Sequence, residues 1–359
     1  MNPGAFCRLA GSLMRHPAAP YHEHAVRAEI ESICDTAGLP FRRDPFGNVL
    51  VELKKGRRAR PVVLAAHLDH PGFEILRALS PRRWLARFCG GVPDNYFRSG
   101  IALRLCPGGT SARLSRRAGE RTFEVTADRP PKSIPQFAVW DLEDFATRRG
   151  RIHGRACDDL VGAAAVLAAI LELRRAPGPF HVIGALSRAE EVGFHGALAI
   201  AATKSLPADA LVISLETSRE LPGVKMGNGV ILRVGDRTSI FDSAAMRFLA
   251  EVAADLKARR PGFGFQRGLM SGGTCEATAY QEYGLQTAGV CVALGNYHNC
   301  AARNRIAAEF VSLRDACAMV DLLVAAVRSA RSFDSIVARL PARLDALWRQ
   351  ARQRLRQTA

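Results

Sequence analysis

The feature that most constrains the fold of this chain is a series of acidic residues and histidines that follow short apolar runs or lie in glycine-rich bends. The runs resemble buried strands, and a strongly apolar helix follows one of the acidic pairs. Open α/β sheets place their sites beyond the carboxyl ends of the strands, so we expect these side chains to converge. They are His67 and Asp69, Asp158 and Asp159, Glu190 and Glu191, Glu216, and His298.

The alternation of predicted strands and helices in the rest of the chain also indicates an α/β protein. Between residues 71 and 150 the pattern changes to short alternating stretches broken by Gly, Pro and Ser, which is typical of a small β-rich, barrel-like domain. We therefore expect a discontinuous catalytic domain (1–70 and 151–330), an inserted domain (71–150) and a C-terminal segment (331–359). Periodicity predicts strands at 48–52, 61–66, 181–186, 211–215, 230–234 and 287–294, and helices at 21–37, 160–173, 242–256 and 313–328.

The C-terminal segment is predicted to be a basic amphipathic helix. From Phe333 to Leu355 its apolar residues fall on roughly one helical face and arginines occupy the rest. Such a helix could cap a subunit interface or lie on an anionic surface. Packing against its own domain or a neighbouring subunit is the interpretation that we prefer here.

Composition favours a globular protein without a membrane span. Of the 359 residues, 48% are hydrophobic, yet no apolar run approaches the ~20 residues that cross a bilayer. The nine cysteines include no C-x-x-C pair, which fits reduced thiols and a cytoplasmic location. We interpret Cys157 and Cys300, which lie beside proposed ligands, as packing residues.

The formal net charge of +16 raises a different hypothesis, a non-catalytic protein that binds polyanions. The arginines are dispersed, without interleaved aromatic residues or a nucleic-acid motif. We therefore expect solvated surface arginine and no specific nucleic-acid partner.

The polar residues match the needs of a two-metal hydrolase. Two divalent ions ~3.5 to 4 Å apart need a bridging carboxylate and further imidazole or carboxylate ligands. Asp158 is the predicted bridge, Glu190 is the predicted general base that takes a proton from a metal-activated water, and Asp69 is predicted to orient the imidazole of His67. The other ligands are predicted to be His67 and Glu216 for one ion, and Glu191 and His298 for the other. Zinc is expected, with cobalt or manganese as alternatives.

Taken together, these motifs resemble those of metallopeptidase family forty-two, the glutamyl and tetrahedral aminopeptidases, in the clan that also holds carboxypeptidases and deacylases. The resemblance spans roughly residues 18–328 and includes Asp44-Pro-Phe-Gly47-Asn48. The insertion lies between His67 and Asp158, as in that family. Glu216 departs from it, because family members usually carry Asp at this position.

The resemblance implies a mixed-sheet α/β/α, zinc-exopeptidase-like catalytic domain with an inserted barrel-like domain. It also implies a homo-oligomeric, dinuclear metallo-aminopeptidase that removes the N-terminal residue from peptides with a free N-terminus. A dizinc amidase, deacylase or dipeptidase is the alternative, because Ser271-Gly-Gly-Thr-Cys-Glu276 and Gly295-Asn-Tyr-His298-Asn299 also resemble those relatives.

Overall fold

The computed structural model describes residues 1–56 and 59–359, and its centre is a large mixed sheet. Within these residues the sheet has 11 strands, ordered β1-β2-β12-β3-β13-β16-β19-β11-β10, while β14 joins it through β16 and β15 through β14. Strands β12, β3, β13 and β16 run parallel, so their carboxyl ends share one edge. The strands are β1 (Phe41–Arg43), β2 (Val49–Lys55), β3 (Pro61–His67), β10 (Ala146–Arg148), β11 (Arg151–Gly154), β12 (Phe180–Ser187), β13 (Leu211–Arg219), β14 (Val230–Gly235), β15 (Phe265–Leu269), β16 (Gln286–Gly295) and β19 (Glu309–Ser312).

Helices cover both faces of this sheet, because its central strands are apolar on both sides. In β3, Val62 and Leu64 pack in one cluster with α1, α3 and α7, whereas Val63 and Ala65 pack in another with α4 and α6. This alternation is the two-residue period of a strand, and it produces the expected α/β/α layers. The helices are α1 (Pro3–Met14), α2 (His24–Ala37), α3 (Cys157–Arg175), α4 (His195–Ala202), α5 (Ser243–Arg259), α6 (Glu276–Glu282), α7 (Leu313–Ser329), α8 (Phe333–Val337) and α9 (Arg339–Gln357).

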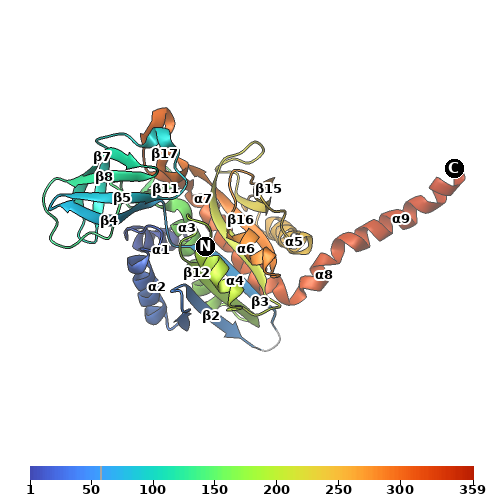
Figure 1. Cartoon of the computed structure of the whole chain (residues 1–359). Helices are drawn as coiled ribbons and strands as arrows, with labels where there is room; N and C mark the ends of the chain where they lie inside the picture. The colour runs from blue at the N-terminus through green and yellow to red at the C-terminus, as the bar shows by residue number, and fades with distance from the viewer. Residues whose placement is uncertain (57–58) are drawn as a thin grey trace.

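A closed barrel interrupts the chain between β3 and β10 (Figure 1, left). Its strands are ordered β4-β5-β8-β7-β6-β9, and its interior contains Phe73 and Trp140. The predicted fold class, an α/β protein with an inserted barrel-like unit, is therefore confirmed; the exact domain boundaries stay a prediction. The barrel strands are β4 (Gly72–Ser80), β5 (Arg83–Cys89), β6 (Ala102–Cys106), β7 (Thr110–Gly119), β8 (Thr122–Ala127) and β9 (Phe137–Trp140).

Short elements complete the chain. They are the two-stranded pair β17 (Cys300–Ala301) and β18 (Arg305–Ile306) and the 3-10 turns η1 (Asp94–Tyr96), η2 (Tyr297–Asn299), η3 (Ala302–Asn304) and η4 (Ala330–Ser332). Among the described residues, no helix is both long and apolar enough to cross a membrane.

Two expected elements differ in the structure. Helix α2 begins at His24 rather than at residue 21, since Tyr21 has a positive φ of 71°. The C-terminal segment is helical as expected, but no residue of α9 is buried and the helix leaves the body of the molecule (Figure 1). Only the start of the segment packs into its own domain, where Phe333 and Ile336 reach the core. Packing of α9 on a neighbouring subunit stays a prediction.

Candidate metal centre

The parallel strands bring the predicted site residues together at one edge of the sheet. His67 is the last residue of β3, Glu190 and Glu191 follow β12, and Glu216 lies within β13. His298 lies in η2, just beyond β16. These strands are neighbours in the sheet, so their register alone brings distant parts of the sequence together.

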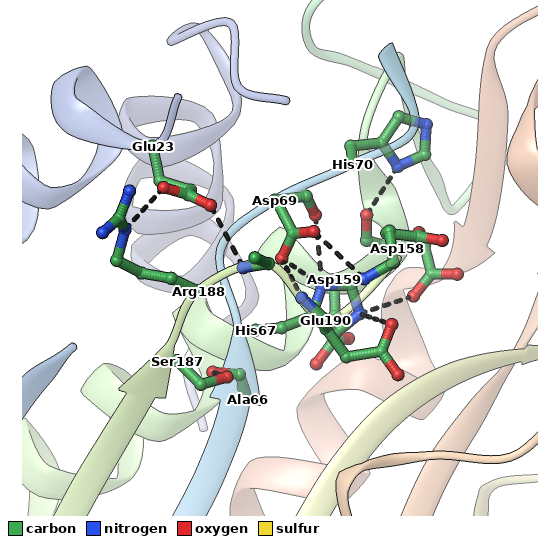
Figure 2. Close-up of polar contacts among 12 residues, drawn as sticks. Glu23, Ala66, His67, Asp69, His70, Asp158, Asp159, Ser187, Arg188 and Glu190 are labelled. Carbon is green, nitrogen blue, oxygen red and sulfur yellow. Dashed lines mark hydrogen bonds and ion pairs between the residues drawn. The ribbon is translucent and has the colours of Figure 1, made fainter. Parts of the chain in front are cut away.

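Asp158, at the start of α3, lies at the centre of the site. Its Oδ1 is 3.4 Å from Nε2 of His67, and its Oδ2 is 3.5 Å from Nε2 of His298. Each carboxylate oxygen therefore faces a different imidazole. Figure 2 shows Asp158, His67 and Glu190 directed toward one another.

Two groups of possible ligands share Asp158. One consists of His67, Asp158 and Glu216, and the other of Asp158, Glu191 and His298. In each group, one ligand atom per residue lies within 4.8 Å of the others. Glu190 belongs with His67 and Glu191 in a third such group, and its Oε2 is 4.0 Å from Nε2 of His67.

The donor atoms fit divalent ions. Oδ1 of Asp158 and Oε1 of Glu191 are buried and have no hydrogen-bond partner among the described residues. Buried carboxylate oxygens without donors are costly unless a cation satisfies them. Imidazole nitrogen and carboxylate oxygen are also the ligand types that zinc and similar ions accept.

The pKa shifts show how much negative charge the site concentrates. Burial, reinforced by Asp158, raises the pKa of Glu216 to about 8. Burial and neighbouring carboxylates also raise the pKa of Glu190 well above its ordinary value. Burial opposes protonation of His67, but the carboxylates of Glu190, Asp158 and Asp69 outweigh it and raise the pKa of this imidazole. A positive ion would relieve this repulsion.

Main-chain carbonyls orient both imidazoles. Nδ1 of His67 lies 3.1 Å from the carbonyl oxygen of Asp69, and Nδ1 of His298 lies 3.0 Å from that of Gly91. A carbonyl accepts only from N–H, so each Nδ1 carries a proton, and in the neutral imidazole the lone pair of Nε2, on the side of Asp158, is available to a metal ion. Gly91 follows β5, so the barrel segment contributes directly to the site.

The Asp69 side chain holds the loop that carries two acidic site residues. Its carboxylate accepts hydrogen bonds from the main-chain N–H groups of Glu190, at 2.9 Å, and Glu191, at 3.1 Å (Figure 2). Its Oδ1 is 3.5 Å from Nδ1 of His67, farther than the carbonyl oxygen of the same residue. Asp69 thus positions three site residues at once.

The Asp44–Asn48 motif supports the same loop from behind. The Asn48 side chain accepts a hydrogen bond from the N–H of Arg188 at 3.0 Å and donates one to the carbonyl of Gly196 at 3.2 Å. Asp44 in turn accepts from Nδ2 of Asn48 at 2.6 Å. The two ends of the loop that carries Glu190 are therefore fixed by one buried amide.

Two important residues are absent from the sequence-based prediction. Glu309, at the start of β19, accepts from the N–H of Asp158 at 3.0 Å and from that of His298 at 2.8 Å. His70 places Nδ1 2.7 Å from the Asp158 carbonyl and Nε2 3.0 Å from Oδ1 of Asn299. His70 directly follows the His67–Asp69 motif, but nothing in the sequence distinguishes its role from that of His67. Glu309 lies in no such motif, and its burial becomes visible only in three dimensions.

A small cavity of about 50 Å³ opens onto the predicted ligands. Besides His67, Asp158, Glu190, Glu216 and His298, it is lined by Arg219, Arg233, Met270, Tyr297 and residues of the 272–274 segment. Arg233 is only 3% exposed, and its Nε has no partner among the described residues. The cavity therefore combines an acidic floor with a buried cation.

Comparisons with known proteins agree with this architecture. A sequence model of the family described as M42 glutamyl aminopeptidase matches residues 133–322. The TET1 peptidase of Pyrococcus horikoshii, which can assemble into a tetrahedron or a large octahedral shell, superposes with a TM-score of 0.74 at 21% identity, covering 90% of this chain and 99% of that one. An aminopeptidase from the archaeon Desulfurococcus kamchatkensis gives 0.75 at 22% identity, with coverages of 93% and 98%. A TET aminopeptidase from the marine sediment archaeon Thaumarchaeota archaeon SCGC AB-539-E09 gives 0.76 at 20% identity, with coverages of 93% and 100%.

Proposed function

We propose, from the premise that this chain belongs to the M42 glutamyl aminopeptidase family, that its metal-dependent aminopeptidase activity uses two divalent ions and a glutamate base. Membership makes the chain a peptide-bond hydrolase, so the non-catalytic polyanion-binding hypothesis is wrong. The observation that carries the two-ion proposal is the position of Asp158 between His67 and His298, with one oxygen toward each.

The two ligand groups define the proposed sites. His67 and Glu216 would hold one ion, Glu191 and His298 the other, and Asp158 would bridge them. When bound, such ions make a water acidic enough to attack at neutral pH and polarise the scissile carbonyl. Zinc is the ion that we propose, with cobalt or manganese as alternatives, because all three accept imidazole and carboxylate ligands.

Glu190 is the proposed general base. Its carboxylate is buried beside His67, and Asp69 anchors its main chain. The raised pKa of Glu190 suits a group that takes a proton from the attacking water and then gives it to the departing amine nitrogen. The bond to that nitrogen breaks as the proton arrives, and the carboxylate is regenerated.

Arg233 suggests which N-terminal residue the cavity accepts. Its guanidinium makes only long contacts, 3.3 Å to Oγ of Ser218 and 3.4 Å to the Gly273 carbonyl, and Arg219 lines the same cavity. A buried guanidinium with an unused donor favours a carboxylate. We therefore propose a preference for N-terminal glutamate or aspartate, in keeping with the family description.

A homo-oligomer and a cytoplasmic location complete the proposal. The P. horikoshii TET1 peptidase can assemble into closed shells, which supports self-association of this chain. The cysteines support a reducing compartment, because all nine are unbridged in the described part of the chain. Light scattering on the purified protein tests the oligomer directly, and a monomer at micromolar concentration would contradict it.

The decisive experiment combines metal analysis with a substrate panel. We expect about two ions per chain and hydrolysis of glutamyl and leucyl anilides that stops on chelation and returns with metal. N-acetylated anilides should not react, whereas a deacylase would accept them. Glu190→Gln should retain both ions and lose turnover, and retained turnover would exclude Glu190 as the base. Asp158→Ala should lose both ions.

A further inference from the structure

Helix α9 presents an apolar stripe with no partner in the chain. The helix projects from the body of the molecule to the C-terminus (Figure 1, right). Leu344, Leu347, Trp348 and Leu355 are 55–60% exposed. At about 100° per residue, these side chains fall on one side of the helix.

The contacts of α9 with the body are confined to its first turns. Nη1 of Arg339 is 2.8 Å from Oδ2 of Asp255, and Nη2 of Arg343 is 2.6 Å from Oε1 of Glu251. Before them, Phe333 of α8 packs in the core beside α5. Beyond residue 343, no hydrogen bond or ion pair joins α9 to the rest of the described chain. The structure therefore anchors the base of the helix and leaves its distal turns free.

This segment lies outside the part of the chain that the family model matches. The similar structures are covered over 98–100% of their length by 90–93% of this chain, and the family match ends at residue 322. Only Phe333 and Ile336 of the segment 333–359 join the core, so α9 itself contributes no buried residue to the fold. Its amphipathic pattern needs a separate explanation, since an isolated helix of this length is only marginally stable in water.

The charge of α9 indicates what covers the stripe. Residues 339–357 contain six arginines and one aspartate, a formal charge of +5 (6 − 1), and no Lys, Glu or His. Arg343 and Arg354 flank the stripe on one side and Arg352 on the other. If the stripes of two copies packed against each other, these arginines would come together, and only Asp345 of each chain would compensate their positive charge. Self-association through the stripe is therefore disfavoured.

We propose that α9 lies in the headgroup layer of an anionic lipid surface and tethers the peptidase there. Leucines and a tryptophan on one face with arginines on the other are the pattern of helices that lie in a membrane interface without spanning it. The flanking guanidiniums would contact lipid phosphates while the apolar stripe enters the acyl boundary. This proposal does not depend on the catalytic chemistry.

Tryptophan fluorescence of the full chain tests the proposal directly. Of the three tryptophans, Trp84 and Trp140 are buried in the barrel, at 5% and 1% exposure, and Trp348 is 57% exposed. Vesicles of phosphatidylcholine with about one third phosphatidylserine should shift the Trp348 emission to the blue and sediment the protein. Pure phosphatidylcholine vesicles should do neither, and high salt should reverse the binding.

Variants separate the apolar and electrostatic contributions. Leu344→Gln with Leu347→Gln should weaken binding about tenfold or more, and neutralising three α9 arginines should weaken it about 100-fold. Neutralising three exposed arginines elsewhere should change binding less than about twofold. Peptidase activity should stay unchanged in every variant. The test set is Arg352, Arg354 and Arg356, and the control set is Arg77, Arg129 and Arg175, each changed to Gln.

Four results would overturn the proposal. They are absence of vesicle binding, equal binding to neutral and anionic vesicles, an oligomer that dissociates in the leucine variant, and tighter binding to a polynucleotide that requires the same arginines. The last two would assign α9 to a second copy of the chain or to nucleic acid instead.

Discussion

Replacing Asp69 tests whether the Glu190–Glu191 loop depends on a single buried carboxylate. Asp69 accepts two main-chain N–H groups, at 2.9 and 3.1 Å, and is fully buried. A hydrogen bond to a charged acceptor contributes roughly 1.5–3 kcal/mol, so Asp69→Ala should lower the free energy of unfolding by about 3–6 kcal/mol. Asp69→Asn retains one acceptor oxygen and turns an NH₂ group toward the second N–H, so its loss should be about half as large.

The same substitutions should reduce turnover. A shift of the Glu190 carboxylate by about 1 Å can cost roughly 100-fold in rate. The assays are urea unfolding of the chelated protein, which removes any contribution of the ions, and kcat/KM of the metal-loaded protein. Asp128→Asn is the matched control: Asp128 is an exposed residue on the barrel, and its substitution should change stability by less than about 0.5 kcal/mol. The reasoning is refuted if Asp69→Ala unfolds at the same urea concentration as the parent with normal turnover.

Three further predictions follow from the geometry. Arg233→Met should reduce kcat/KM for glutamyl substrates about 10- to 100-fold and change leucyl substrates only a few-fold; an equal loss on both, or loss of metal, would show instead that Arg233 supports the ligands. Without metal, the raised pKa values of Glu216, about 8, and Glu276, about 7, mean that the folded state binds more protons than the unfolded state. In chelated protein, the free energy of unfolding measured with urea should therefore fall from pH 5 to pH 8. The fall should be about 1.4 kcal/mol for each unit by which the pKa in the folded state exceeds that in the unfolded state. Metal-loaded protein should not show this fall, and identical profiles with and without metal would contradict the prediction. Gly196→Ala would place a Cβ against the main chain of Arg188 and the side chain of Asn48. The free energy of unfolding, measured from the urea midpoint, should therefore fall by roughly 1–3 kcal/mol. An unchanged midpoint would mean that the loop moves to accommodate the methyl group.

The sequence predicts the large mixed sheet well because its strands are short and apolar and are bounded by residues that end strands, such as Gly and Pro. Strand β3 was expected at residues 61–66 and is observed at Pro61–His67. Its alternate residues face two separate helical layers, so both faces select apolar side chains and the run is continuous. The strand that carries Glu216 is less well delimited. It was expected to end at residue 215 but runs to Arg219, because pairing with β16 continues past the acidic residue.

The convergence of the predicted ligands could also be expected, since parallel strands end at one edge. Their supporting contacts could not. Gly91 orients His298 through a carbonyl oxygen, which every residue type possesses, so no side-chain pattern marks it. Glu309 is a single acid in a strand, and its role depends on two N–H groups that are 151 and 11 residues away in sequence. Likewise, periodicity identifies the stripe on α9 but does not say whether the body of the molecule covers it.

The order of the strands has a consequence for synthesis of the chain. The proposed metal centre includes His67, from the first fifth of the chain, and His298, and Glu309 holds the main chain of two of its proposed ligands. A nascent chain that has emerged from the ribosome only as far as β14 therefore contains the proposed base and all the proposed acidic ligands but lacks one imidazole and its support. With the proposed ligand set, peptide hydrolysis would begin only after His298 has emerged, at about five sixths of the 359 residues. A peptidase built in this order is inactive while it is itself an unfinished polypeptide.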